Sequence, residues 1–292
     1  MRMIVTGSSG QLGSEICRLS THETYGTYLG DLPRAGRAKP MRMDITDAEA
    51  VNKVFASVKP DCVVHCAAMT SVDSCETDKD MAWEVNVDGT KNIVRACSKF
   101  GASLVYISTD YVFDGKKGNY VETDVPNPLN HYACTKLAGE MLARTLDKHM
   151  ILRSSVMFSA GGNNFVSWVR DSLSKGQTKI VTDQINSPTL ATEMAETVLR
   201  LVELDATGVY HTAGAERISR YDFAKAIAKV FGLDASRITA AKTAELGQKA
   251  VRPVDSSLKI AKVKKLGITF SNVEKALRKL KEMEDTAGGH ED

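Results

Sequence analysis

The first thirteen residues constrain the fold of this chain more than any other segment. Residues 1–6 form an apolar run typical of a strand, Gly7-Ser8-Ser9-Gly10-Gln11-Leu12-Gly13 follows, and a helical pattern begins directly after it. In a strand–turn–helix unit, glycines allow a tight turn and a close approach of the backbone to a pyrophosphate held at the helix N-terminus. An ordinary tight turn is the alternative, but the strand before and the helix after favour dinucleotide binding. The predicted cofactor-binding residues here are Gly7, Ser9, Gly10, Gln11, Leu12 and Gly13.

The chain then alternates strands with helices, which predicts an α/β fold with a Rossmann-like, doubly wound parallel sheet. Strands are expected at residues 24–29, 41–43, 61–68, 103–107 and 151–152. The run at 61–68 is nearly continuously apolar, as in a strand buried on both faces, so we interpret His65 as a core histidine. We expect a Rossmann domain over residues 1–155 and a smaller, mostly helical substrate lobe over residues 156–292, some segments of which return to the Rossmann domain.

Small and polar residues follow these strands, at the sheet edge where ligands bind in open parallel sheets. Asp44 has two interpretations that stay open: it caps the helix at 48–58, or it accepts a hydrogen bond from an adenine amino group. Asp47 is the better cap for that helix. Ala67-Ala68 leaves room for a cofactor, and Ser108-Thr109-Asp110 arrives where the nicotinamide half of a dinucleotide would lie.

Tyr132 and Lys136 lie four residues apart in a segment with a helical pattern. Residues at that spacing share one face of a helix, and a nearby ammonium favours the phenolate, lowering the tyrosine pKa from about 10. Tyr132 is therefore a candidate general acid or base. The alternative is a surface pair that merely shares a helix face.

Composition excludes several classes of protein. The 292 residues carry a net charge of only +2, and their basic residues are largely scattered, so nucleic-acid binding is not expected. Because no apolar run approaches about 18 residues, we expect no membrane span and a cytoplasmic location. The six cysteines show no zinc-type spacing; we expect reduced thiols and predict no metal site.

Several motifs together resemble the extended short-chain dehydrogenase/reductases, and within them the dTDP-4-dehydrorhamnose reductase family. The resemblance covers nearly the whole chain, and its most specific part is Ser108-Thr109-Asp110-Tyr111-Val112-Phe113-Asp114-Gly115. It also includes the segment from Tyr132 to Lys136 with Gly139-Glu140, and Arg252-Pro253. The family's sixth strand usually leads into a tryptophan beside the sugar, whereas this chain reads Arg153-Ser154-Ser155-Val156.

The resemblance implies reduction of a nucleotide-linked 4-keto-6-deoxy sugar by NADPH or NADH. It implies that Tyr132 donates the proton, Lys136 holds the nicotinamide ribose, and Thr109 binds the carbonyl oxygen. The further cofactor-binding residues implied are Asp44, Ile45, Ala67, Ala68, Met69, Tyr132 and Lys136. The implied substrate residues are Thr109, Asp110, Tyr111, Asn164 and Arg252, and for Arg252 a surface salt bridge is the alternative.

Two other functions stay open: a non-catalytic, cofactor-binding regulatory protein resembling the β subunit of methionine adenosyltransferase, and a nucleotide-sugar epimerase. Retention of Thr109, Tyr132 and Lys136 argues for catalysis. We expect NADPH to be used at least as well as NADH, because Arg34 and Arg37 follow the second strand, although Asp31 opposes a 2′-phosphate. A homodimer is compatible with these expectations.

Overall fold

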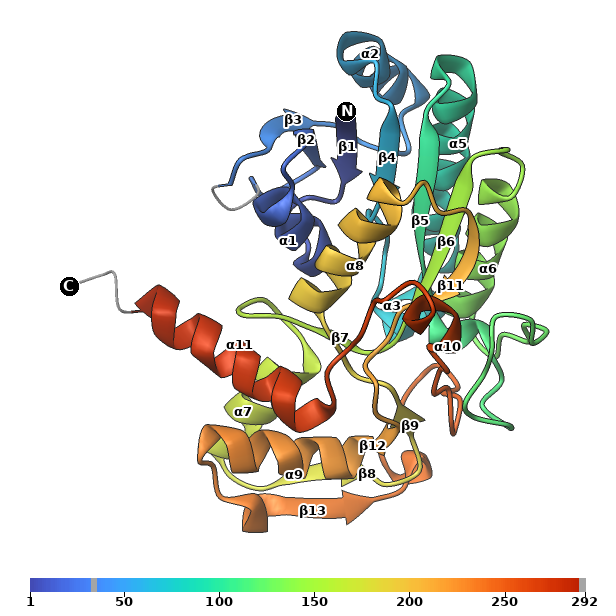
Figure 1. Ribbon diagram of the computed structural model, residues 1–292. Helices are drawn as coiled ribbons and strands as arrows, with labels where there is room; N and C mark the ends of the chain where they lie inside the picture. Colours follow the sequence, from blue (N-terminus) through green and yellow to red (C-terminus); the bar gives the residue numbers. More distant parts are fainter. Residues whose placement is uncertain (33–35, 289–292) are drawn as a thin grey trace.

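The computed structural model describes residues 1–32 and 36–288 and has an α/β architecture built on one central sheet (Figure 1). Among these residues, seven strands pair in parallel in the order β11-β6-β5-β4-β1-β2-β3. The strands are β1 (Arg2–Thr6), β2 (Glu23–Tyr28), β3 (Lys39–Arg42), β4 (Cys62–His65), β5 (Ser103–Thr109), β6 (His149–Ser154) and β11 (Gly208–His211). The fold is thus the predicted Rossmann-like, doubly wound sheet.

Helices cover both faces of this sheet. One face packs against α1 (Gln11–Leu19) and α8 (Ala191–Glu203), and the other against α2 (Ala48–Val58), α5 (Gly89–Phe100) and α6 (His131–Ala143). Because both faces are covered, all four residues of β4 are buried, and His65 is a core residue held by Thr6 and Thr90, as predicted. Burial lowers the pKa of His65 to about 3, so the imidazole is neutral.

The sequence pattern predicts one long helix over residues 79–99, but the structure divides this region into shorter segments. The chain between β4 and α5 contains α3 (Val72–Thr77) and α4 (Lys79–Trp83), followed by a π-helical turn at Glu84–Asp88 that leads into α5. Within this turn, the Asn86 side chain bonds both the N–H and the carbonyl of Met69 and also the hydroxyl of Thr135. The π-helical turn therefore links the loop after β4 to α6.

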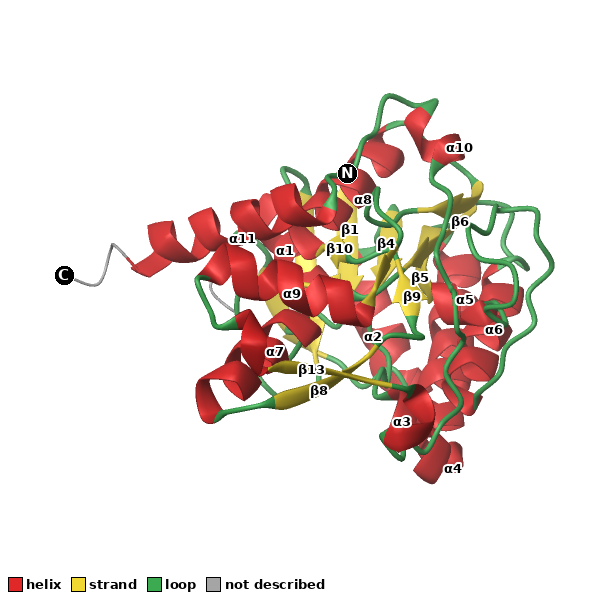
Figure 2. Cartoon of the chain, turned by 90° about the horizontal axis from the view of Figure 1, so that it is seen from below, coloured by secondary structure: helices red, strands yellow, loops and turns green. Residues whose placement is uncertain are grey.

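The second lobe lies beyond the carboxyl ends of the strands and is built mainly from α7 (Phe165–Lys175), α9 (Arg220–Phe231) and α11 (Val273–Gly288) (Figures 1 and 2). These helices share one apolar core with the small parallel pair β8 (Thr178–Val181) and β13 (Ile238–Ala241). Two further short pairs join β7 (Met157–Phe158) to β10 (Thr189–Leu190), and β9 (Ile185–Asn186) to β12 (Ile218–Ser219). A short helix, α10 (Ala261–Lys264), packs near β11.

Two segments of the second half belong to the central layers. Strand β11 adds the seventh strand beside β6, and α8 packs against α1. The sequence indicated a short strand at 209–211 but not its place in the sheet, because a strand this short carries no signal for its partner. The position of the domain boundary at residue 155 stays a prediction.

Candidate active site

A cavity of about 1110 Å³ opens where the carboxyl ends of the strands meet the second lobe. The strand order reverses between β1 and β4, since the chain passes from β1 out to β3 and returns on the other side. Ligands of doubly wound sheets bind in the crevice at such a reversal. The cavity reaches from the glycine turn to α9, so both lobes line it.

The glycine turn is shaped for a bulky anion rather than for side chains. Gly7 has φ +66°, and a Cβ there would lie 2.8 Å from the Ala67 backbone. A Cβ at Gly13 would lie 2.3 Å from the Gly7 carbonyl oxygen, so Gly13 is required for the close packing of α1 on the turn. Among the described residues, no side chain caps the N-terminus of α1, which leaves its first N–H groups for a phosphate.

Most residues expected to bind the cofactor line the cavity. They are Gly7, Ser9, Gly10, Gln11, Leu12, Gly13, Asp44, Ile45, Ala67, Ala68, Tyr132 and Lys136. Met69 is not among the lining residues, and its neighbour Thr70 lines the cavity instead. The backbone N–H and carbonyl of Met69 bond the Asn86 side chain. The residues present therefore fit a dinucleotide lying from the glycine turn to Lys136.

The structure separates the two acidic residues after β3. Asp47 caps α2 by accepting hydrogen bonds from the N–H groups of Glu49 and Ala50, as predicted. Asp44 instead accepts from the N–H and hydroxyl of Thr46, and it lines the cavity. The cap interpretation of Asp44 was thus wrong, which leaves it available to a ligand.

The structure describes two of the three residues expected to decide between NADPH and NADH. Leu29 and Gly30 line the cavity after β2, but Asp31 and Arg37 are not among the lining residues. Arg34 lies outside the described residues. The expectation that NADPH is used at least as well as NADH therefore stays a prediction from the sequence.

At the end of β5, the Thr109 hydroxyl accepts the N–H of Tyr111 and donates to Asp110 Oδ1 at 3.1 Å. The other carboxylate oxygen of Asp110 accepts from Ser155 at 2.7 Å and from Ser256 at 2.5 Å. Asp110 is 2 % exposed, and burial raises the pKa of its carboxyl. Asp110 lines the cavity, and its oxygens accept hydrogen bonds from three hydroxyls, one of them that of Thr109.

Tyr132 and Lys136 lie on α6 beside this network, as the helical spacing predicted. Tyr132 is hydrogen-bonded to Thr109, and its ring meets Tyr111 edge-on at 6.5 Å. Burial raises the pKa of Tyr132 in the ligand-free protein, and the bond to Thr109 opposes this only in part. This direction is opposite to the one expected from Lys136, because burial penalises the phenolate and the neighbouring Asp110 adds to the upward shift. Tyr132 therefore carries its proton at neutral pH.

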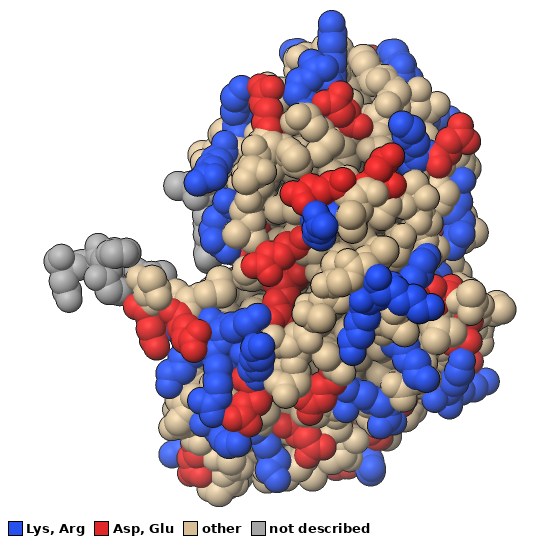
Figure 3. All heavy atoms as spheres, in the orientation of Figure 1, with Lys and Arg blue, Asp and Glu red and all other residues tan. Residues whose placement is uncertain are grey.

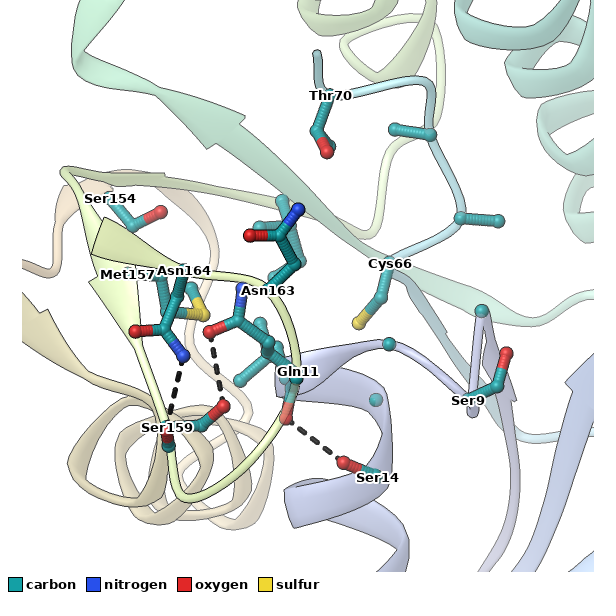
Figure 4. Close-up of a pocket in the computed structure, with 18 of the residues that line it drawn as sticks. Ser9, Gln11, Ser14, Cys66, Thr70, Ser154, Met157, Ser159, Asn163 and Asn164 are labelled. Atoms are coloured by element: carbon teal, nitrogen blue, oxygen red, sulfur yellow. Dashed lines mark hydrogen bonds between the residues drawn. The ribbon is translucent and has the colours of Figure 1, made fainter. Parts of the chain in front are cut away.

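On the side of the second lobe, Asn164 and Arg252 differ in placement. Asn164 lines the cavity, but its side chain caps α7 and donates to the Ser159 carbonyl (Figure 4). Ser159 also donates to the Gln11 side chain at 3.0 Å, which joins this loop to the glycine turn (Figure 4). Arg252 is not among the lining residues, and its guanidinium pairs with Asp73 at 2.7 Å.

Sequence reasoning missed a cation and two aromatic rings at this end of the cavity. Arg220, at the start of α9, lies over the Phe165 ring at 4.6 Å, and Phe165 stacks on Trp168 at 5.8 Å. All three line the cavity, and the Trp168 side chain is 44 % exposed. A lone arginine at a helix start carries no signal in sequence, because only folding brings α7 and α9 together.

Val156, in the segment where the resemblance led us to expect a tryptophan, lines the cavity. Its φ of +39° lies in the left-handed region, which a β-branched residue rarely adopts. Such strained residues concentrate at functional sites. The backbone after β6 is thus fixed by its surroundings rather than by local preference.

The wider surface and the helices add little to this site. Basic and acidic side chains are interspersed over the face in Figure 3, in line with the net charge of +2. Among the helices that the structure describes, none combines the length and apolar character needed to span a bilayer. In the same residues, no three His, Cys, Asp or Glu side chains are grouped as metal ligands.

A seven-stranded parallel sheet with a glycine turn after its first strand and a tyrosine–lysine pair beside the cavity is the arrangement of an extended short-chain dehydrogenase/reductase. The family model described as "RmlD substrate binding domain" matches residues 1–285. The dTDP-4-dehydrorhamnose reductase of Aggregatibacter actinomycetemcomitans is 33% identical over 96% of this chain and 98% of its own length. The chain belongs to the dTDP-4-dehydrorhamnose reductase family.

Solved and curated relatives extend this comparison. The structure of dTDP-4-dehydrorhamnose reductase from Bacillus anthracis in complex with NADP superposes with a TM-score of 0.88 at 30% identity, covering 97% of this chain and 99% of that one. The methionine adenosyltransferase 2 subunit beta of Bos taurus is 30% identical over 91% of this chain and 83% of its own length. The relatives of this chain thus include named reductases and a subunit of a different enzyme.

Proposed function

We propose that this protein is an NAD(P)H-dependent reductase of a nucleotide-linked 4-keto-6-deoxy sugar. The observation that carries the proposal is the convergence of Thr109, Tyr132 and Lys136 at a cavity that also contains an uncapped, glycine-rich dinucleotide turn. The similarity to named dTDP-4-dehydrorhamnose reductases supports the substrate class.

In this proposal, the glycine turn would hold the pyrophosphate, Asp44 the adenine and Lys136 the nicotinamide ribose. The bound nicotinamide would supply the hydride. Tyr132 gives its phenolic proton to the sugar oxygen, so that the carbonyl becomes an alcohol. Thr109 bonds the Tyr132 hydroxyl and lies where it stabilises the developing negative charge on that oxygen.

The substrate's diphosphate would lie toward Arg220, and its base against Trp168. Arg220 is the cation that lines this end of the cavity, whereas Arg252 is engaged by Asp73. An arginine fork suits phosphate oxygens, and an exposed indole suits a nucleobase face. NADPH use rests on the relative solved with NADP.

The test is to mix the purified protein with NADPH or NADH and a panel of nucleotide 4-keto-6-deoxy sugars, following absorbance of the reduced cofactor. Tyr132→Phe is the matched control, because it keeps the ring and removes only the transferable proton. We expect turnover to fall at least about a hundredfold while cofactor affinity stays nearly the same. If the protein binds the cofactor but turns over none of the sugars, the proposal of a reductase is rejected in favour of a regulatory, cofactor-binding protein.

A further inference from the structure

Lys136 is a buried ammonium without an ion pair of its own. It is 5 % exposed, its Nζ lies 4.3 Å from the centre of the Tyr106 ring, and within the described residues no carboxylate forms a salt bridge with it. A cation in such a place costs free energy unless a negative charge compensates it. The protein must therefore supply that charge from nearby.

One helical turn further along α6, the Glu140 carboxylate is fully buried and fixed on both oxygens. Arg153 of β6 donates to it twice, from Nε at 2.8 Å and from Nη2 at 2.7 Å. Ser108 of β5 donates to the same carboxylate at 2.6 Å. Arg153 itself is 1 % exposed and lies over the Phe113 ring at 5.1 Å. The carboxylate thus cannot turn away from the face of α6 that carries Lys136.

The other groups near Lys136 are uncharged at neutral pH. Burial raises the pKa of Cys66, at the end of β4, and that of Tyr106 on β5, and it holds the pKa of His65 on β4 at about 3. Burial lowers the pKa of Lys136 to about 8, and the Coulombic attraction of the Glu140 carboxylate, which is paired with Arg153, opposes this shift. Removing the Glu140 carboxylate should therefore lower the Lys136 pKa further.

We propose that the buried Glu140–Arg153 pair is a positioning element for the Lys136 ammonium: its carboxylate keeps Lys136 charged, and Arg153 with Ser108 keeps the carboxylate in place. This inference deepens the proposed function, since a charged Lys136 is required to hold the ribose and assist Tyr132. Neither Glu140 nor Arg153 lines the cavity, so the pair acts through Lys136.

The test measures the charge of Lys136 directly, in the ligand-free protein. Trace acetylation across a pH series, with mass spectrometry of the Lys136 peptide, gives its apparent pKa without any turnover. We expect Glu140→Gln to lower the Lys136 pKa by about one unit, the effect of removing one buried charge a helical turn away. Glu140→Asp keeps the charge and should restore most of the lost pKa. Asp147→Asn removes an exposed carboxylate between α6 and β6 and should change nothing.

Glu140→Gln leaves Arg153 unpaired in the core and is expected to lower the thermal midpoint. The double variant Glu140→Gln/Arg153→Met removes both charges and carries the test if the single variant does not fold. It should lower the Lys136 pKa by less than the single variant does, because no uncompensated cation remains. An unchanged Lys136 pKa in a folded variant without the Glu140 charge would overturn the proposal.

Kinetics provide the second measurement. Reduction needs protonated Lys136, so its rate should fall as pH rises through the Lys136 pKa, and that alkaline limb should move to lower pH in Glu140→Gln by the same amount. If the wild-type protein reduces no sugar, but Glu140→Gln still lowers the Lys136 pKa measured by labelling, the reductase function is rejected. The effect of Glu140 on the charge of Lys136 is then retained. If the alkaline limb of the pH–rate profile stays in place while the Lys136 pKa measured by labelling falls, the link between Glu140 and catalysis is overturned.

Discussion

Asp110 illustrates how a single residue at this site balances conflicting demands. Its carboxylate is buried among three hydroxyls and forms no ion pair within the described part of the chain. Burial raises its pKa above the ordinary value near 4, and the hydrogen bonds from Ser256, Ser155 and Thr109 offset only part of this shift. The stability that this group contributes is therefore present at acid pH and lost as pH rises through the folded pKa.

Asp110→Asn keeps the size of the side chain and removes this titration. We expect urea unfolding to show that wild type loses stability relative to the Asn variant as pH rises above the ordinary carboxyl pKa of about 4. We also expect a lower kcat, because an amide that donates to Thr109 changes which way its hydroxyl points. A stability difference independent of pH would show that Asp110 does not titrate in this range.

In the glycine turn, substitutions at Gly10 and Gly13 are expected to have different effects, one on cofactor binding and the other on stability. From sequence alone, we expected Val at Gly10 or Gly13 to block dinucleotide binding without unfolding the chain. At Gly13 a Cβ would lie 2.3 Å from the Gly7 carbonyl oxygen, so we now also expect a loss of stability there. At Gly10 a Cβ meets only that carbonyl at 3.2 Å, and the remaining space belongs to the cavity.

We therefore expect Gly10→Val to keep its thermal midpoint and lose at least about tenfold in NADPH affinity, since the side chain occupies the place of the pyrophosphate. Gly13→Ala should lower the free energy of unfolding by about 1–3 kcal/mol, the usual cost of overpacking. Calorimetry and cofactor titration on both variants check this. Normal NADPH binding in Gly10→Val would contradict the phosphate role of the turn.

Elements with local signals were predictable, and arrangements that depend on distant contacts were not. The glycine turn, the Asp47 cap and the helix of Tyr132 follow from short-range patterns, and the structure contains all three. The place of β11 beside β6, the π-helical turn that aims Asn86, and the cluster of Arg220 with Phe165 arise from tertiary packing. The raised pKa of Tyr132 belongs to the second group, because burial is a property of the whole fold.

The whole molecule divides one cavity between two lobes. The Rossmann layers provide the glycine turn and the Tyr132–Lys136 pair, and the second lobe provides Asn164, Trp168 and Arg220. Hydrogen bonds from Ser159 to Gln11 and from Thr192 to Glu15 connect later segments of the chain to α1. The two ligands of the proposed reaction should therefore respond to different sets of substitutions.

Two arginines make this division testable. Arg220→Met removes the cation from the cavity but keeps much of the apolar stem over Phe165, so KM for the nucleotide sugar should rise at least about tenfold, as when one charged contact to phosphate is lost. The Kd for NADPH should stay nearly the same. Arg252→Met is the matched control: it breaks the pair with Asp73 outside the cavity, and we expect it to lower stability with a smaller change in KM. Steady-state kinetics with fluorescence titration of NADPH distinguish the two. A larger rise in KM for Arg252→Met than for Arg220→Met would indicate that Arg252 binds the diphosphate, as the sequence first indicated. It would also mean that the ion pair between Arg252 and Asp73 opens when the sugar binds.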